Sequence, residues 1–277
     1  MAEQTKGKVN LLGRLLPEGL LVDAAWLGAH GYSTSLRRQY VTAGWLDQPT
    51  RQVYRRKRGS VGWQQVVVSL QTLLDHNLIV GGRTALELEG FAHYLSQETR
   101  MVHLYGPSRP PNWLNKLPVD ADFIYHNIGR LFAHPAAKPS CDPNDRMSTP
   151  STAVPSDLLA QPWGQWEWAL ILSSPERALL ELLDELPDRE TFHQVDKLVE
   201  GLSSLSPRRL ENLLHDCRSV KVKRLFFLFA DRHEHAWLKH INRKRVDLGQ
   251  GKRMLVRGGK LSAAYQITVP EDFDGVQ

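Results

Sequence analysis

The sequence predicts an α+β fold: an N-terminal winged helix-turn-helix followed by a mixed α/β C-terminal domain that contains a proline-rich loop. Three features of the 277-residue chain lead to this prediction. Short helical patterns precede a basic hairpin pattern in the first 60 residues, helix and strand patterns resume after residue 63, and prolines gather in one segment. A chain of this length has room for two hydrophobic cores. We therefore expect domains at residues 1–62 and 63–277, with a flexible loop at 133–162.

The first predicted domain is built from short amphipathic elements. Ser33 follows a glycine-containing turn and is a suitable N-cap, and Gly44 ends the helix that Ser33 begins. The expected elements are helices over 8–16, 20–28 and 34–43 and strands over 45–46 and 51–57, with a turn at 47–50. Two helices, a short turn, a third helix and a hairpin follow one another in this order in a winged helix-turn-helix.

The distribution of charge indicates a polyanionic partner for this domain. Residues 1–60 contain ten Lys and Arg against four Asp and Glu, a net charge of +6, whereas the rest of the chain carries about −1. A local excess of this kind is typical of a surface that faces nucleic acid. The residues that we expect to contact double-stranded DNA are Ser33, Thr34, Arg37 and Arg38 at the third helix and Arg51, Arg55, Arg56, Lys57 and Arg58 on the hairpin. The alternative is a small helical hairpin with a solvated charged face.

The remainder of the chain alternates between helix and strand patterns. Six of the 16 prolines fall within residues 133–162, which is why we expect a loop there. Ser174-Pro175-Glu176 has the cap, first-turn proline and first-turn acid of a helix start. The expected elements are helices over 66–74, 84–90, 175–183, 192–202, 208–214 and 221–229, strands over 78–82, 101–105, 123–132 and 166–172, and a hairpin around Gly258-Gly259.

No pattern for catalysis or for a cofactor is present in the sequence. The phosphate-binding GxxxxGK[ST], the nucleophile GxSxG and the dinucleotide-binding GxGxxG are all missing, so we expect no enzymatic activity. His233, His235 and His240 lie close together, but their spacing and the lack of a nearby cysteine disfavour a metal site. The acidic run from Glu181 to Glu190 is expected to form the solvated face of an amphipathic helix.

Two further features bear on the compartment of the protein. No apolar stretch approaches the length needed to span a bilayer, and Met1 to Lys8 has no apolar signal region. The two cysteines, Cys141 and Cys217, form no CxxC pair, so a reducing environment is the simple interpretation. We expect a cytoplasmic protein without a membrane partner.

Three segments of the chain resemble a known family. The run GLLVDAAWLGAHGYSTSLRRQYVTAGWLDQPTRQVYRRK (19–57) resembles the winged helix of AbiEi-type antitoxins, from type IV toxin–antitoxin systems of abortive infection. VGGRTALELEG (80–90) resembles the segment that follows this winged helix, and LILSSPERALLELLDEL (170–186) resembles the start of the family's distal helical region. The three segments occur in the family's order and span most of the chain. The loop at 133–162 has no counterpart in this resemblance.

The resemblance implies a function for each domain. Such antitoxins bind inverted repeats in their own promoter and repress the operon, and their C-terminal domain counters a nucleotidyltransferase-like toxin, usually without a stable complex. The family pattern places Ser33, Thr34, Arg37 and Arg38 on the recognition helix and Arg51, Arg55 and Arg56 on the wing.

A basic stripe in the second domain is our candidate for toxin countering. Its members, Arg218, Lys221, Lys223 and Arg224, are expected to border the surface that acts on the toxin or on its nucleotide or RNA target. The alternative is that these four cations form a solvated helix edge. For the whole chain, the alternative is a plain transcriptional regulator of a mobile element with a ligand-sensing or oligomerisation domain. An adjacent gene for a nucleotidyltransferase-like protein would favour the antitoxin.

Overall fold

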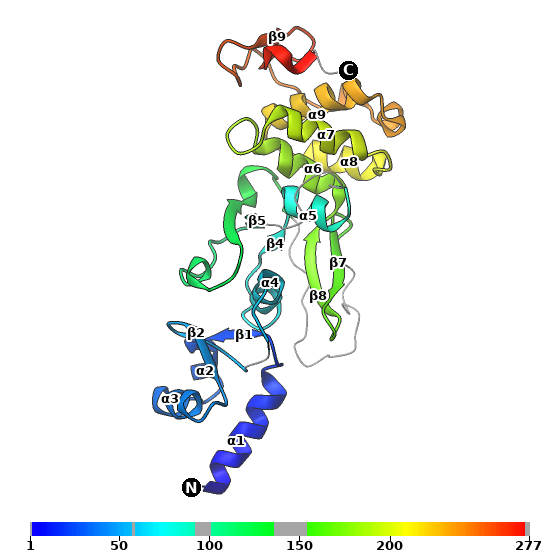
Figure 1. Ribbon diagram of the computed structural model, residues 1–277. Helices are drawn as coiled ribbons and strands as arrows, with labels where there is room; N and C mark the ends of the chain where they lie inside the picture. Colours follow the sequence, from blue (N-terminus) through cyan, green and yellow to red (C-terminus); the bar gives the residue numbers. More distant parts are fainter. Residues whose placement is uncertain (1, 57–58, 92–100, 136–153, 275–277) are drawn as a thin grey trace.

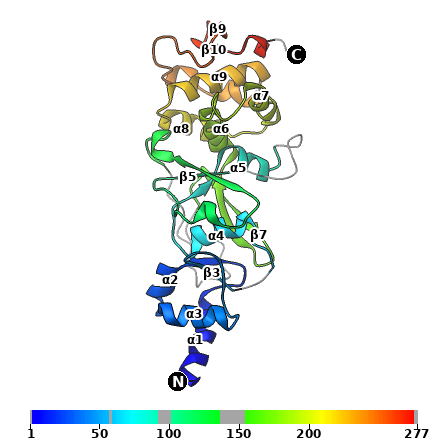
Figure 2. The ribbon, with the colours of Figure 1, turned by 60° about the vertical axis from the view of Figure 1, so that its left-hand side comes forward.

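The computed structural model describes residues 2–56, 59–91, 101–135 and 154–274. The molecule is elongated, with the N-terminal helix at one end and the C-terminal hairpin at the other (Figures 1 and 2). A winged helix-turn-helix, a mixed sheet and a helical layer follow one another along its length. Helices and strands are mixed throughout, which confirms the predicted α+β class.

Residues 2–55 form a winged helix-turn-helix. Its elements are α1 (Ala2–Leu15), β1 (Leu21–Asp23), α2 (Ala24–Ala29), α3 (Thr34–Thr42), β2 (Asp47–Thr50) and β3 (Val53–Arg55). The three strands pair antiparallel in the order β1-β3-β2. Ser33 caps α3 as predicted, because its hydroxyl accepts from the Leu36 amide at 3.3 Å.

Two local predictions for this domain were wrong. Residues 21–23 form strand β1 where the sequence predicted helix, since a short apolar run suits either structure. Asp23 then begins α2 by accepting from the Trp26 amide at 2.7 Å. The hairpin also turns later than predicted: residues 47–50 are strand β2, and the turn lies at Arg51 and Gln52, where Gln52 has φ +67°.

A five-stranded mixed sheet occupies the middle of the molecule. Its order is β6-β5-β4-β8-β7, with β5 parallel to β6 and β4 parallel to β8. The elements are α4 (Trp63–Thr72), β4 (Ile79–Val80), α5 (Gly82–Leu88), β5 (Met101–Gly106), β6 (Asp122–Asn127), β7 (Leu158–Trp163) and β8 (Trp168–Ser173), with 3₁₀ turns at Leu114–Lys116 and Ile128–Arg130. Strand β7 corrects the predicted loop at 133–162, because residues 158–162 pair with β8. Residues 136–153 of that prediction lie outside the described residues.

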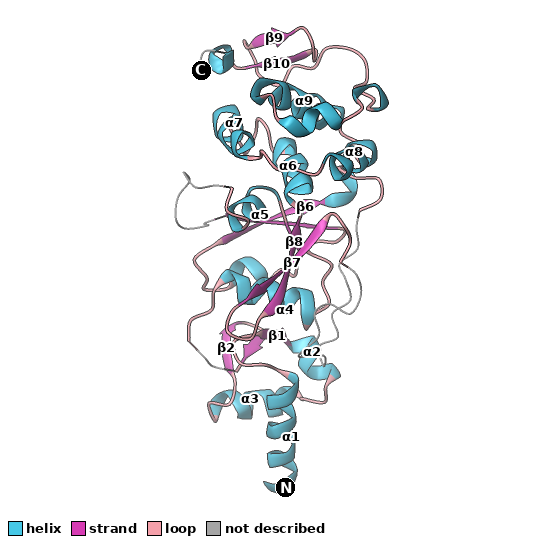
Figure 3. Cartoon of the chain, turned by 90° about the vertical axis from the view of Figure 1, so that its right-hand side faces the viewer, coloured by secondary structure: helices cyan, strands magenta, loops and turns pink. Residues whose placement is uncertain are grey.

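Four helices and a hairpin complete the chain beyond the sheet (Figure 3). They are α6 (Pro175–Asp184), α7 (Phe192–Gly201), α8 (Pro207–Asp216), α9 (Val220–His233), β9 (Lys260–Ser262) and β10 (Ile267–Val269), with 3₁₀ turns at Ala236–His240, Arg243–Arg245 and Glu271–Asp274. The predicted helix start at Ser174 is confirmed, since its hydroxyl accepts from the Arg177 amide. The hairpin turns between Ser262 and Ile267, later than the predicted Gly258-Gly259.

Helix α4 joins the winged helix to the sheet. The Ser69 hydroxyl on α4 accepts from the Leu21 amide of β1 at 2.8 Å. Two residues further along α4, the buried Gln71 amide group bonds to the Leu78 and Ile171 carbonyls and to the Ile171 amide. Buried apolar side chains form one continuous cluster from Leu12 to Phe273. Within the described ranges, no helix has the length and apolar character of a membrane span.

Candidate nucleic-acid interface

Helix α3 presents a polar, solvent-exposed face. Tyr40 lies on its opposite face and is buried against Tyr32, with the two ring centroids 6.1 Å apart. Ser33, Thr34 and Arg38 are exposed along the outer face of the helix start. The structure therefore brings together three of the four residues predicted for the recognition helix, Ser33, Thr34 and Arg38, on one exposed side of α3. Such a helix fits the major groove of duplex DNA.

Arg37, the fourth predicted residue, turns inward. Its guanidinium donates to the Ala24 carbonyl of α2 at 2.7 Å and to the Thr34 hydroxyl at 2.8 Å. It also lies 5.8 Å from the centre of the Tyr54 ring on β3. Arg37 therefore links α3 to α2 and to the wing. Its side chain positions α3 and does not extend into solvent from it.

The predicted wing residues separate into two groups. Arg55 is buried on β3 and pairs with Asp47 of β2 at 2.9 Å. Arg56 pairs with Glu18 at 3.0 Å and donates to the Gly13 and Leu16 carbonyls at the end of α1. Arg51 is exposed at the hairpin turn. Lys57 and Arg58 lie outside the described residues.

These contacts single out the cations that can meet DNA. Among the described members of the predicted set, Arg38 and Arg51 are exposed and have no acidic partner. Trp45, which follows α3 and was not predicted for the interface, exposes about half of its side chain beside the helix end. The combination of a cation, small hydroxyl residues and an exposed ring is suited to contacts with base edges and the sugar–phosphate backbone.

The four cations predicted as a toxin-countering stripe do not share one exposed face. Lys221 donates to the Asp184 and Leu186 carbonyls at 2.5 and 2.8 Å, and Lys223 is buried. Arg224 is also buried and donates to the carbonyls of Leu248, Gly251 and Gln266. Arg218 is exposed and donates to the Gly129 carbonyl at 3.1 Å. Lys221 and Arg224 therefore connect separate segments of the domain through backbone carbonyls, and Lys223 is buried.

Three of the five acids in the run from Glu181 to Glu190 are buried, contrary to the expected solvated face, while Asp184 is half-buried and Asp188 is exposed. Glu181, Glu185 and Glu190 are all buried, because α5 and the sheet cover one side of α6 while α7, α8 and α9 cover the other. Glu181 pairs with the fully buried Arg177 at 2.9 Å and accepts from the Gly82 amide at 2.9 Å. The spacing of apolar residues in the sequence indicated one buried face of α6. The helix has a second buried face, which carries charged side chains that form ion pairs. Burial raises the pKa of Glu181, and Arg177 opposes that rise.

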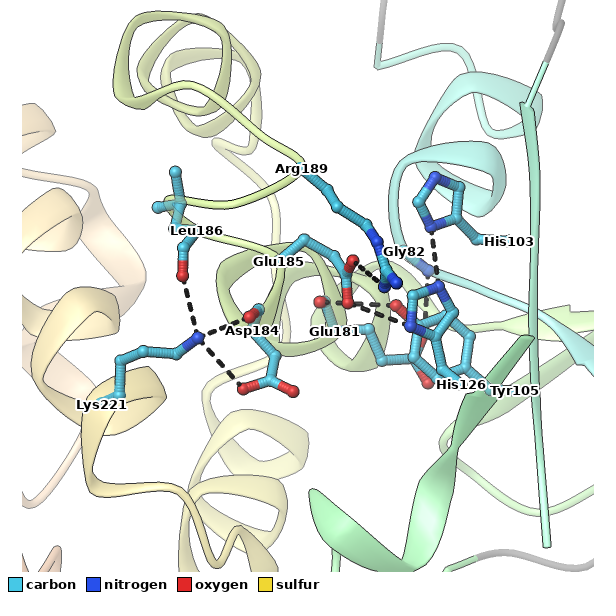
Figure 4. A network of polar contacts seen from close by, with 10 residues as sticks. All are labelled: Gly82, His103, Tyr105, His126, Glu181, Asp184, Glu185, Leu186, Arg189 and Lys221. Carbon is cyan, nitrogen blue, oxygen red and sulfur yellow. Dashed lines mark hydrogen bonds and ion pairs between the residues drawn. The ribbon is translucent and has the colours of Figure 1, made fainter. Parts of the chain in front are cut away.

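The same region contains a hydrogen-bonded chain of three side chains from distant segments (Figure 4). His126 Nδ1 lies 3.0 Å from Glu185 Oε1, and His126 Nε2 lies 3.0 Å from His103 Nδ1. His103 and His126 come from adjacent parallel strands, and their rings are within 5° of parallel. Burial and the neighbouring His126 lower the pKa of His103 to about 4, so His103 is neutral at neutral pH.

Two imidazoles and one carboxylate are also a common ligand set for transition metals. All three side chains are buried, and their ligand atoms lie within 4.8 Å of one another. Both nitrogens of His126, however, already face a neighbour at hydrogen-bond distance, so the donors do not converge on one point. The arrangement is a hydrogen-bonded chain that links the end of α6 to the sheet. Sequence reasoning missed it because the members are separated by 23 and 59 residues and share no motif.

Comparison with known proteins gives consistent matches over nearly the whole chain. A family model described as transcriptional regulator, AbiEi antitoxin N-terminal domain, matches residues 5–97. A second, described as transcriptional regulator, AbiEi antitoxin, type IV TA system, matches residues 99–270. A crystal structure of the RV2827C protein from Mycobacterium tuberculosis is similar in fold, with a TM-score of 0.55 and 15% identity, covering 94% of this chain and 88% of that chain. No curated protein sequence matches the chain.

Proposed function

The chain belongs to the AbiEi antitoxin family, the transcriptional regulators of type IV toxin–antitoxin systems, and on that premise we propose that it represses its own operon and counters a nucleotidyltransferase-like toxin. Its DNA partner is the promoter duplex, recognised at inverted repeats. Its protein target is the cognate toxin, countered without a stable complex. Both activities are at work in the cytoplasm, and neither requires catalysis by this chain.

The observation that carries the DNA-binding part is the exposed face of α3. Arg38 and Thr34 extend from a helix that Ser33 caps and Arg37 braces, next to a hairpin whose turn exposes Arg51. A braced helix can hold a guanidinium at the fixed geometry that a guanine edge requires. Arg51 at the turn is placed to contact a phosphate beside the groove.

We assign the two activities to separate parts of the chain. Residues 1–62 bind DNA, residues 63–277 counter the toxin, and α4 joins the two. Of the four cations predicted for toxin countering, Arg218 is exposed, Lys221 is half-buried, and Lys223 and Arg224 are buried. Lys221 and Arg224 support this surface by holding α9 against its neighbours.

Substitutions in the full-length chain test this assignment. Arg38→Ala is expected to abolish repression of a promoter–reporter fusion while leaving rescue from the co-expressed toxin intact. Arg218→Ala should have the opposite effect, and Arg208→Ala, at an exposed arginine of α8, is the matched control for both. If Arg38→Ala retains full repression, the recognition-helix assignment is wrong. If no substitution outside the winged helix affects rescue, the chain is a plain regulator.

A further inference from the structure

The segment from Lys239 to Lys260 concentrates positive charge at the end of the molecule opposite to the winged helix (Figures 1 and 2). We call it the C-terminal basic segment. It contains eight Lys and Arg against one acid, Asp247, a net charge of +7. All eight cations are exposed: Lys239, Arg243, Lys244, Arg245, Lys252, Arg253, Arg257 and Lys260. The overall charge of residues 63–277, about −1, conceals this local excess.

Most of these cations are not used to hold the fold together. Within the described part of the chain, Arg243 pairs with Asp231, whereas Lys239, Lys244, Arg245, Lys252, Arg253 and Arg257 have no acidic partner. A solvated surface normally intersperses both signs of charge, because like charges at close range repel one another. A cluster of unpaired cations is therefore a binding surface for a polyanion.

The segment is nevertheless held in a fixed path. The buried Arg224 guanidinium on α9 donates to the Leu248 and Gly251 carbonyls at 2.7 Å and to the Gln266 carbonyl at 3.2 Å. The Arg253 amide donates to the Gln266 carbonyl at 2.9 Å, and the Thr268 amide donates to the Arg253 carbonyl at 3.1 Å. The exposed cations therefore extend from a fixed backbone, which lowers the entropic cost of binding.

A hollow of about 420 Å³ opens within this surface. It is lined by Leu238, Lys239, Ile241, Asn242, Arg243 and Lys244. The two aliphatic side chains offer an apolar wall, and three cations and one amide surround it. This volume falls in the range of small-ligand sites, and the lining suits a base together with its phosphate.

We propose that the C-terminal basic segment binds single-stranded RNA, with phosphates on the unpaired cations and one unstacked base in the hollow. Duplex DNA fits poorly, because the segment contains 3₁₀ turns and only the first residue of strand β9, and it has no α-helix to enter a groove. A protein partner fits poorly too, because Met254 is the only exposed large apolar side chain of the segment. Single strands in a cell are mostly RNA, and their bases are free to leave the stack. This site is independent of the duplex site on α3.

The test uses the full-length chain saturated with an unlabelled 30-base-pair duplex, so that the winged helix is occupied. A fluorescein-labelled 20-nucleotide RNA of mixed sequence is then titrated and its anisotropy recorded. We expect RNA to bind this complex, with log K falling against log salt at a slope of about −3 if four phosphates are contacted. A DNA strand of the same sequence should bind more weakly. Displacement of the RNA by the duplex, or tighter binding of the DNA strand, would overturn the proposal.

Charge reversal locates the site. Lys244→Glu, Arg245→Glu, Lys252→Glu and Arg253→Glu combined should weaken RNA binding about 100-fold and leave duplex binding unchanged. The matched control combines Arg109→Glu, Lys116→Glu, Arg130→Glu and Arg208→Glu, four exposed cations elsewhere whose reversal changes the net charge equally. Equal losses of RNA affinity in the two variants would mean that net charge alone drives binding, and this would contradict a specific site in the C-terminal basic segment. The milder pair Lys244→Ala and Arg245→Ala, also at exposed positions, should still weaken RNA binding about tenfold.

Discussion

Arg37 and Arg38 are adjacent in the sequence and have different surroundings. Arg37 donates to the Ala24 carbonyl and to the Thr34 hydroxyl, whereas Arg38 extends into solvent. The sequence placed both on one polar helix face, because helical periodicity gives the direction of a side chain but not whether a neighbouring helix binds it. We therefore assign the proposed DNA contact of this pair to Arg38.

Arg38→Ala should reduce discrimination between promoter and scrambled duplex by about 1–3 kcal/mol, the range for one bidentate guanine contact. The thermal midpoint should not change, because Arg38 is exposed and makes no hydrogen bond or ion pair within the described part of the chain. Arg37→Ala should instead lower the thermal midpoint. Competition binding and thermal melting of both variants measure the two effects. The assignment fails if Arg37→Ala is the variant that loses sequence preference while keeping its stability.

The buried pair of Arg177 and Glu181 differs from the surface pairs of the chain. Arg177→Met should lower the free energy of unfolding by about 3–5 kcal/mol, because it leaves the Glu181 carboxyl group in the interior without the cation that pairs with it. Lys197→Met, which removes the exposed pair with Glu200, should cost less than about 1 kcal/mol. Urea denaturation of the two variants gives the comparison. Similar losses of unfolding free energy in the two variants would show that the pair of Arg177 and Glu181 is exposed to solvent.

His103 provides a pH dependence that can be isolated. Its pKa is about 4 in the folded chain and about 6.5 when unfolded, so the unfolded state binds the proton more readily. The stability that results is complete above pH 6.5 and declines by about 1–3 kcal/mol as the pH falls toward 4. His103→Asn should flatten this decline, whereas His240→Asn at an exposed position should not. If the unfolding free energies of the unmodified chain and of both variants decline equally between pH 6.5 and 4, the assignment to His103 is wrong.

At the scale of elements, the helix caps were predictable and the short strands were not. Ser33 and Ser174 start α3 and α6 as their sequences predict, because a cap is a local interaction. Strand β1 has three residues and β7 contains a proline at an edge, so their pairing depends on partners far along the chain. The basic hairpin was identified, but its turn was misplaced by about four residues. The buried acids of α6 were missed because their cations come from other elements.

Gln71 on α4 shows how one element can join two others. Its side-chain amide bonds to the Leu78 carbonyl and to both backbone groups of Ile171, and it is fully buried. Gln71→Leu should lower the free energy of unfolding by about 2–4 kcal/mol, since these backbone groups lose their partner in the interior. Gln64→Leu, on the half-exposed side of the same helix, is the control. Equal effects of the two changes would mean that α4 does not depend on this contact.

At the scale of the whole molecule, the arrangement separates two cationic surfaces. The recognition helix α3 lies near one end and the C-terminal basic segment lies at the other (Figure 1). The net charge of residues 1–60 predicted the first surface, because cations outnumber acids over that whole segment. It obscured the second, because acids elsewhere in residues 63–277 cancel it. The fold shows that five of these acids, Glu176, Glu181, Glu185, Glu190 and Asp196, are buried, whereas the cations of the basic segment are exposed.

The central claim is that the winged helix reads the promoter of its own operon. Titration of the full-length chain against a labelled promoter duplex and a scrambled duplex, over a series of salt concentrations, tests it most directly. We predict tighter binding to the promoter duplex, with a slope of log K against log salt of about −4 from four to five phosphate contacts. Equal affinity for both duplexes, or an affinity that does not change with salt, would contradict the claim.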